Sequence, residues 1–147
     1  MSINILITGA SSGIGFQAAV QLINNGYKII APCRNKEKSY STYELLKKEC
    51  ISDIDIDDYL ELPAVDLSSL NEIKEFSEQL LLKGSTIDIL ILNAGLQYTG
   101  SRKPRWSKDG VELTFAVNHL AHQYLTQLIS SLYEKSKSPR VIITSSE

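Results

Sequence analysis

The sequence has few cysteines, little net charge and no long apolar run. Its two cysteines, Cys33 and Cys50, show no motif spacing, which favours free thiols over a disulfide framework. The net charge of −2 gives no support to a nucleic-acid partner or an anionic membrane surface. No segment approaches the roughly 18 apolar residues of a membrane span, and the N-terminus shows no signal-peptide pattern. These absences predict a cytoplasmic protein without an integral membrane segment.

The sequence instead alternates strand-like and helix-like segments over 147 residues, enough for a single domain. We predict strands over 3–8, 28–33, 60–65, 87–92 and 140–145. We predict helices over 13–25, 41–50, 69–83 and 107–134. This alternation predicts an α/β fold with a doubly wound parallel sheet. No helix follows the fifth strand before Glu147, so we expect a fold truncated there, whose exposed edge could recruit a second copy or aggregate.

A glycine-rich turn joins the first predicted strand to the first predicted helix. It reads Thr8-Gly9-Ala10-Ser11-Ser12-Gly13-Ile14-Gly15. Backbone N–H groups and the helix dipole at such a turn attract a pyrophosphate, and glycine lets the backbone approach it closely. The turn therefore predicts a Rossmann-like, NAD(P)-binding domain over 1–147, with Ser11 and Ser12 as further donors.

The second predicted strand ends in Pro32-Cys33-Arg34, without the acidic residue that usually accepts hydrogen bonds from the ribose of NAD. A guanidinium there binds a 2′-phosphate as a bidentate donor. Arg34 therefore predicts NADP(H), and a solvated loop arginine is the alternative. After the fourth predicted strand, Asn93-Ala94-Gly95 offers small residues that keep a cleft open for a ribose. An ordinary turn is the alternative there.

These motifs resemble the short-chain dehydrogenase/reductase family. The resemblance covers Thr8 to Gly15, Asn93 to Gly95, a mid-helix Asn118 and a serine-bearing strand from Val141 to Ser146. Asp109 to Glu112, followed by Val117 to Leu120, is similar to the retinol dehydrogenase and light-dependent protochlorophyllide reductase branches. The stretch 102–104 is more similar to the protochlorophyllide reductase branch.

The resemblance implies an NADPH-dependent oxidoreductase that transfers a hydride to a small-molecule carbonyl or alkene. It implies that Asp66, followed by Leu67, contacts the adenine and that Asn93 supports the ribose region of the cofactor. Asn118 would hold a water of a proton relay. Ser146 matches the catalytic serine, and Ser145 is the alternative if the register differs by one residue.

The family's acid is a tyrosine in a Tyr-x-x-x-Lys motif after that serine, and the 147 residues end before such a motif. Tyr133 to Lys137 matches the string but precedes the serine strand. We expect it at a solvated helix end, on the edge of the sheet opposite the cofactor. The chain alone is therefore expected to be inactive. The alternative is a non-catalytic nucleotide-binding fragment.

Two further patterns imitate metal sites. Asp53, Asp55 and Asp57 have the spacing of the first ligands of a calcium loop, but the glycine and glutamate such a loop needs are missing. His119 and His122 lie one helical turn apart without a third ligand nearby in the sequence. We predict no metal.

Overall fold

Five short strands form one parallel sheet in the order β3-β2-β1-β4-β5. The computed structural model describes residues 3–97 and 103–145. The strands are β1 (Asn4–Ile7), β2 (Lys28–Ile30), β3 (Leu60–Glu61), β4 (Ile89–Leu92) and β5 (Arg140–Ile143). The central strand β1 pairs Ile5 with Ile29 of β2 and with Ile89 of β4. This strand order confirms the predicted Rossmann-like, doubly wound fold.

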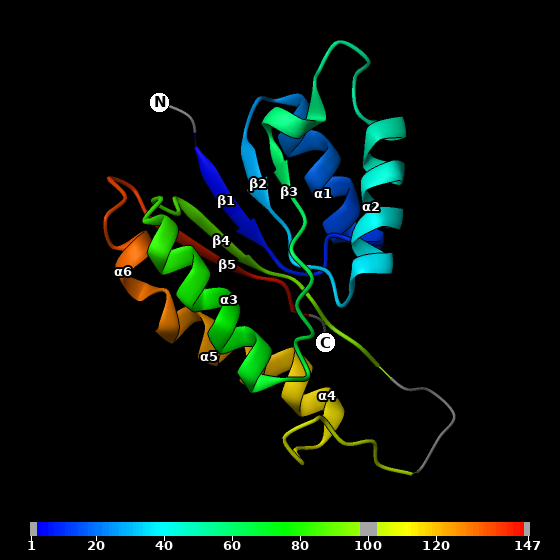
Figure 1. Ribbon diagram of the computed structural model, residues 1–147, viewed down its shortest axis with the longest axis vertical. Helices are drawn as coiled ribbons and strands as arrows, with labels where there is room; N and C mark the ends of the chain where they lie inside the picture. Colours follow the sequence, from blue (N-terminus) through cyan, green and yellow to red (C-terminus); the bar gives the residue numbers. More distant parts are fainter. Residues whose placement is uncertain (1–2, 98–102, 146–147) are drawn as a thin grey trace.

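Helices cover both faces of the sheet (Figure 1). They are α1 (Gly13–Asn24), α2 (Lys36–Glu49), the 3₁₀ helix η1 (Ile56–Asp58), α3 (Leu70–Lys83), α4 (Leu113–Phe115), the π-helix η2 (Ala116–Leu120), α5 (Ala121–Leu128) and α6 (Ser130–Tyr133). Helices α1 and α2 lie on one side, and α3 and α5 on the other (Figure 1).

The apolar core has two parts, because neighbouring residues of a buried strand face opposite sides of the sheet. Leu6 of β1 packs with Ile73 of α3 and Leu125 of α5. The next residue, Ile7, packs with Ile23 of α1 and Leu46 of α2. The sheet is therefore held between the two helical layers, and its carboxyl edge is left to loops.

Two predicted helix boundaries are wrong. Helix α2 begins at Lys36 instead of 41, because the Asn35 side chain caps it by accepting a hydrogen bond from Lys38 N at 2.8 Å. The helix predicted over 107–134 begins too early: the helical residues run from Leu113 through α4, η2 and α5 to Leu128, and α6 follows after Ile129. Gly110, at φ 75°, belongs to a turn before α4, which begins only after Glu112 accepts hydrogen bonds from the backbone of residues 114 and 115.

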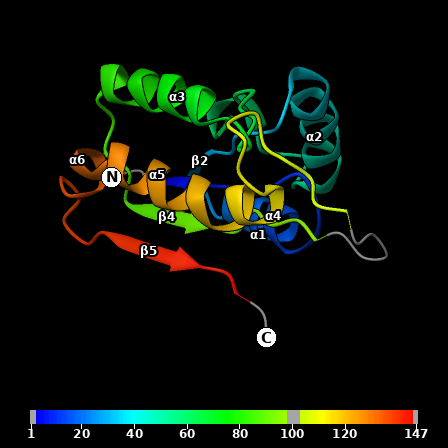
Figure 2. The ribbon, with the colours of Figure 1, turned by 90° about the horizontal axis from the view of Figure 1, so that it is seen from below.

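Strand β5 lies at the edge of the sheet (Figure 2). Within the described residues it pairs with β4 alone, and Val141, Ile142 and Ile143 are 45%, 46% and 69% exposed. No helix in residues 3–97 or 103–145 has the length and apolar character needed to cross a membrane.

Candidate functional site

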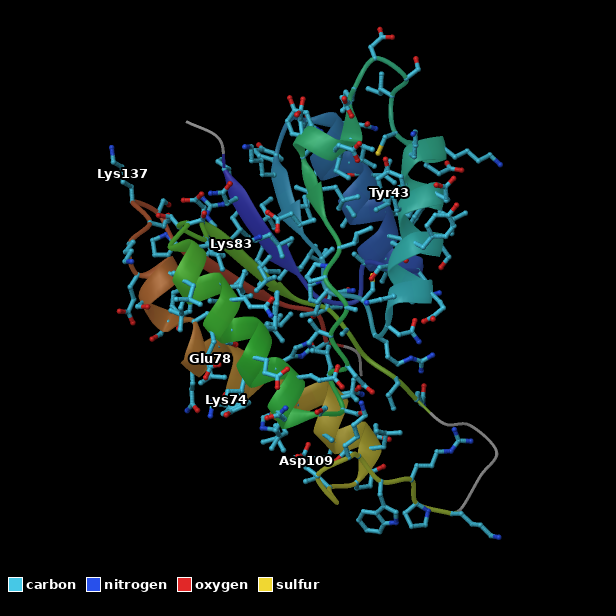
Figure 3. All side chains as sticks on the ribbon, in the orientation of Figure 1. Tyr43, Lys74, Glu78, Lys83, Asp109 and Lys137 are labelled. Carbon is cyan, nitrogen blue, oxygen red and sulfur yellow. The ribbon has the colours of Figure 1, made fainter. Side chains whose placement is uncertain are left out.

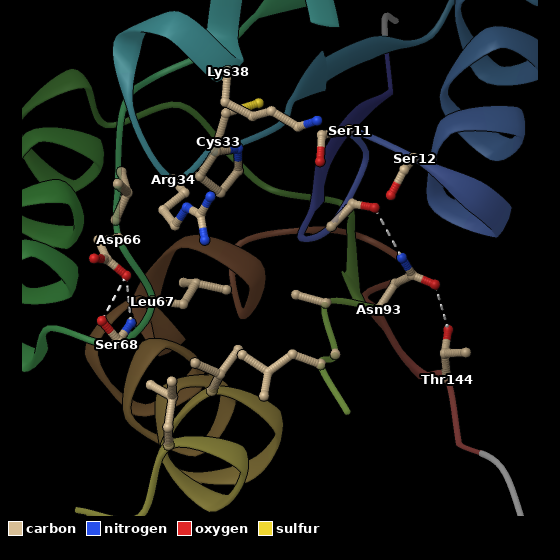
Figure 4. A pocket seen from close by; sticks show the side chains of 18 of the residues that line it. Ser11, Ser12, Cys33, Arg34, Lys38, Asp66, Leu67, Ser68, Asn93 and Thr144 are labelled. Atoms are coloured by element: carbon tan, nitrogen blue, oxygen red, sulfur yellow. Dashed lines mark hydrogen bonds between the residues drawn. The ribbon is translucent and has the colours of Figure 1, made fainter. Parts of the chain in front are cut away.

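A pocket of about 630 Å³ opens where β1, β2 and β4 end (Figure 4). It brings together most of the predicted cofactor residues. Those that line it are Gly9, Ser11, Ser12, Ile14, Arg34, Asp66, Leu67, Asn93, Ala94 and Gly95. Thr8 is fully buried at the end of β1, next to the pocket residue Gly9. Ser146 lies outside the described residues, and the neighbouring Ser145 is exposed.

The three glycines of the turn disfavour a side chain for different physical reasons. A Cβ on Gly9 would lie 2.6 Å from Ala94 Cα, and one on Gly15 would clash with the Gly9 carbonyl and the Asn93 amide. Gly13 has open space around it, but its φ of 57° lies in the left-handed region. Close packing therefore accounts for Gly15, backbone conformation accounts for Gly13, and both account for Gly9, whose φ is 73°.

The start of α1 borders the pocket and has the features of an anion site. Ser12 is the extended residue before the helix, and its side chain makes no capping hydrogen bond. The first backbone N–H groups of a helix have no partner within the helix and carry the positive end of its dipole. Ile14, in the first turn, is 75% exposed and lines the pocket.

Asn93 joins three strands beneath this loop. Its Nδ2 donates to the carbonyls of Thr8 and Gly9, both at 3.2 Å, and its Oδ1 accepts from the Thr144 hydroxyl at 3.1 Å (Figure 4). Its backbone N donates to Thr8 Oγ1 at 3.0 Å. The ends of β1, β4 and β5 are thus tied together at the pocket floor.

Asn118 holds the chain that follows the Asn93-Ala94-Gly95 turn. Its Oδ1 accepts from Leu96 N at 2.8 Å, and its Nδ2 donates to Leu96 O at 2.9 Å. The residue lies in the π-helix η2, a widened turn of the kind frequently found at functional sites. Val117, in the same turn, lines the pocket. The water-holding role of Asn118 stays a prediction.

Two cations line the β2–α2 side of the pocket, Arg34 and Lys38 (Figure 4). Arg34 is a residue predicted from the sequence, whereas Lys38 was not predicted. The sequence signal for Lys38 was the helix-capping residue Asn35. Because α2 begins at Lys36, Lys38 lies in its first turn, near the end of β2. The pocket therefore has a positive wall where the second strand ends.

Asp66 is held as an ionised carboxylate at the pocket wall. Its Oδ1 accepts from Ser68 N at 2.9 Å and from the Ser68 hydroxyl at 2.8 Å, and Lys108 Nζ lies 3.4 Å from Oδ2. Burial raises the pKa of Asp66, but the Ser68 hydrogen bonds and Lys108 together outweigh burial and lower it. Lys108 also donates to Glu72 at 2.6 Å, and this hydrogen bond is the main reason the pKa of Glu72 is lowered.

The Tyr133–Lys137 segment lies at the other edge of the sheet, as predicted. The Tyr133 hydroxyl donates to the backbone carbonyl of Thr126 at 3.3 Å. Ser136 donates to Asp88, just before β4, at 2.7 Å. Figure 3 shows Lys137 beside the amino-terminal ends of the strands. This tyrosine and lysine therefore lie far from the pocket.

The residues of the two imitated metal sites have contacts within the protein. Asp55 accepts from Asp57 N at 3.2 Å at the start of η1, and Asp57 accepts from the Tyr43 hydroxyl at 2.9 Å. The His119 ring lies 5.2 Å from that of Phe115. His122 is buried, and both of its ring nitrogens have hydrogen-bond partners.

The family model for short chain dehydrogenases matches residues 4–147. The chain therefore belongs to the short-chain dehydrogenase/reductase family. It is 36% identical to human "Retinol dehydrogenase 13" over 143 residues, which are 97% of this chain and 40% of that protein. It is 39% identical to the Drosophila melanogaster "WW domain-containing oxidoreductase" over 145 residues, 97% of this chain and 33% of that protein. The chain thus spans less than half the length of these relatives.

Solved structures share the fold. A metagenomic short-chain oxidoreductase in complex with NADP superposes with a TM-score of 0.77 at 25% identity, over 99% of this chain and 62% of that one. Menthone neomenthol reductase from Mentha piperita superposes with a TM-score of 0.80 at 23% identity, over 99% of this chain and 61% of that one. The second likeness shows the fold alone.

Proposed function

We propose that this chain forms the cofactor-binding part of an NADP(H)-dependent oxidoreductase. The observation that carries the proposal is the pairing of Arg34 with Lys38 on one wall of a pocket whose floor is the glycine turn. An acidic residue, which would repel a 2′-phosphate, is absent from the sequence directly after β2. The donor set thus fits a dinucleotide with a third phosphate group.

Different residues along the pocket would bind different parts of the cofactor. The start of α1, with Ser11 and Ser12, would hold the pyrophosphate, and Arg34 with Lys38 would hold the 2′-phosphate. Asp66 and Leu67 would contact the adenine, and Asn93 to Gly95 would border the ribose at the nicotinamide end. When bound, the nicotinamide supplies hydride chemistry. Asn118 and Ser146 are proposed to position a relay water and the substrate oxygen, as the family resemblance implies.

A carbonyl or alcohol on a small apolar molecule is the first substrate class to test. The support is the name of one relative, retinol dehydrogenase, at 36% identity. Reduction of an alkene, as the protochlorophyllide reductase-like resemblance suggests, is the second class. A protein that binds NADPH but transfers hydride to neither class would instead fit the non-catalytic nucleotide-binding alternative.

Cofactor discrimination tests the proposal directly. We expect Arg34→Ala and Lys38→Ala each to weaken NADPH binding by about 1.5–3 kcal/mol, the range for hydrogen bonds to charged groups, and to leave NADH binding nearly unchanged. Titration of the nicotinamide fluorescence measures both affinities. Lys47→Ala is the matched control, because Lys47 lies in the last turn of the same helix, over the Tyr43 ring. Equal loss for both cofactors would count against a 2′-phosphate role.

A further inference from the structure

A buried histidine links the glycine turn to the π-helix. His122 is 7% exposed and lies at the start of α5. Its Nε2 is 2.8 Å from Thr8 Oγ1 at the end of β1, and its Nδ1 is 3.2 Å from the backbone oxygen of Asn118. Thr8 and His122 are 114 residues apart in the sequence. One imidazole thus spans the distance between the pocket floor and the turn that carries Asn118.

The other hydrogen bonds of Thr8 decide where the proton of the imidazole is. A threonine hydroxyl has one proton to donate and two lone pairs to accept with. Thr8 Oγ1 already accepts from Asn93 N and from Ala94 N, both at 3.0 Å. Its proton must therefore go to His122 Nε2, which accepts it. The imidazole proton is then on Nδ1 and is donated to the Asn118 carbonyl.

The opposite tautomer does not fit these contacts. A proton on Nε2 would point at a hydroxyl oxygen whose two lone pairs are already engaged, and the Thr8 proton would have no acceptor. Nδ1, without a proton, would face the Asn118 carbonyl oxygen, two acceptors 3.2 Å apart. Burial also lowers the pKa of His122, which favours the neutral ring that this arrangement needs.

We propose that His122 is a positioning residue of the cofactor site, acting in its neutral form with the proton on Nδ1. By accepting the Thr8 proton it turns both lone pairs of that hydroxyl toward Asn93 N and Ala94 N. It thereby fixes the turn that borders the pocket and on which Gly9 and Gly15 pack. By donating to Asn118 it fixes the π-helical turn relative to the same floor. The inference rests on the proposed function for its readout by cofactor affinity.

The tautomer itself has a spectroscopic test. Long-range ¹H–¹⁵N correlation spectra of the folded protein distinguish a protonated ring nitrogen from an unprotonated one. We expect the Nε2 signal of His122 to be that of an acceptor nitrogen and the Nδ1 signal that of a protonated nitrogen. The reverse pattern, or rapid exchange of two tautomers, would overturn the proposal. This measurement needs no cofactor, so it decides the question even if the protein binds no NADPH, a result that would refute only the proposed function.

Three substitutions of His122 distinguish a positioning role, which depends on its hydrogen bonds, from a role in filling space in the core. In His122→Gln the side-chain oxygen reaches the place of Nε2 and accepts the Thr8 proton. In His122→Asn the amide reaches only the place of Nδ1, and in His122→Phe neither contact is possible. We expect the Phe and Asn variants to raise the NADPH Kd about tenfold, the cost of a buried unpaired hydroxyl, and the Gln variant to stay within about threefold of wild type.

The matched control is His119→Gln on the same helical segment, where the side chain is exposed. It should leave the NADPH affinity unchanged. Circular dichroism and thermal melting verify that each variant is folded. Folded Phe and Asn variants that bind NADPH as tightly as wild type would overturn the proposal. So would a Gln variant that loses as much affinity as the Phe variant. The comparison of Gln with Asn remains informative if the Phe variant does not fold.

Discussion

At the scale of single residues, the glycine turn separates two needs that a motif alone does not distinguish. Gly15 cannot carry a Cβ because the Gly9 carbonyl and the Asn93 amide occupy its place, whereas Gly13 needs only its left-handed backbone. The Thr8-Gly9-Ala10-Ser11-Ser12-Gly13-Ile14-Gly15 string was recognisable because it follows a strand and opens a helix. The different roles of the glycines depend on Asn93, which packs against the turn although it lies more than 75 residues later in the sequence.

We expect Gly15→Ala and Gly13→Ala to have different effects. Gly15→Ala must displace the Asn93 amide or the turn, which costs about 1–3 kcal/mol of stability, as overpacking does, and weakens NADPH binding. Gly13→Ala meets no neighbour and costs about 1–2 kcal/mol, the penalty of a left-handed residue with a Cβ. Urea unfolding and NADPH titration of both variants make the comparison. If NADPH affinity falls equally in both, the packing explanation for Gly15 is wrong.

At the scale of elements, local sequence patterns predicted most of the helices and strands and failed where tertiary contacts define a boundary. The apolar periodicity of α1 and α3 gave both helices within a residue or two. The helix predicted over 107–134 wrongly included the segment 107–112. This segment is instead a turn, in which Asp109 reaches back to cap α3 by accepting from Leu70 N at 2.8 Å. A bond between residues 39 positions apart leaves no local pattern to read.

The same turn is joined to α3 through Lys108, and this link should make stability depend on pH. The pKa values of Asp66 and Glu72 are lowered in the fold, so their stabilisation is complete above their unfolded pKa values, about 3.9 and 4.3. It is lost as the pH falls through the lower folded values. Lys108→Met should therefore lower the free energy of unfolding at pH 7 and reduce its decline between pH 6 and pH 3.

The matched control is Lys74→Met, which removes an exposed lysine from α3 that lies 4.0 Å from Glu78 (Figure 3). An isolated surface pair of this kind contributes little, and its removal should leave the pH profile close to wild type. Urea unfolding at several pH values, at low and at high salt, measures both variants. Identical pH profiles for wild type and Lys108→Met would show that Lys108 does not stabilise the two carboxylates.

At the scale of the whole molecule, the parallel sheet determines where the chemistry lies. Because the strands run in one direction, the residues that follow β1, β2 and β4 meet at one edge, although they are far apart in the sequence. The sequence therefore predicted most of the pocket from the ends of its strands. It did not predict Lys38, because that prediction requires the true start of α2. It also did not predict the Thr8–His122 hydrogen bond, because that bond depends on a contact between the end of β1 and α5.

The outer strand of the sheet, β5, is the second feature at the scale of the whole molecule. In the 147-residue polypeptide, β5 pairs with β4 among the described residues, and its apolar side chains are exposed, Ile143 to 69%. An apolar strand with an unpaired edge is a template for pairing with another chain. We expect this polypeptide to bind hydrophobic dyes and to self-associate as its concentration rises. Ile143→Lys should reduce both effects, because charge on an edge strand opposes pairing.

Leu82→Lys tests whether the location of the apolar residue matters. Leu82 is even more exposed, at 87%, but it lies in the helix α3 and not on a strand, so it offers no strand edge for pairing. Analytical ultracentrifugation over a range of concentrations should therefore show a shift toward monomer for Ile143→Lys and little change for Leu82→Lys. A wild-type polypeptide that stays monomeric at every concentration would refute the expectation. Equal shifts in the two variants would assign the association to general hydrophobicity and not to the edge of the sheet.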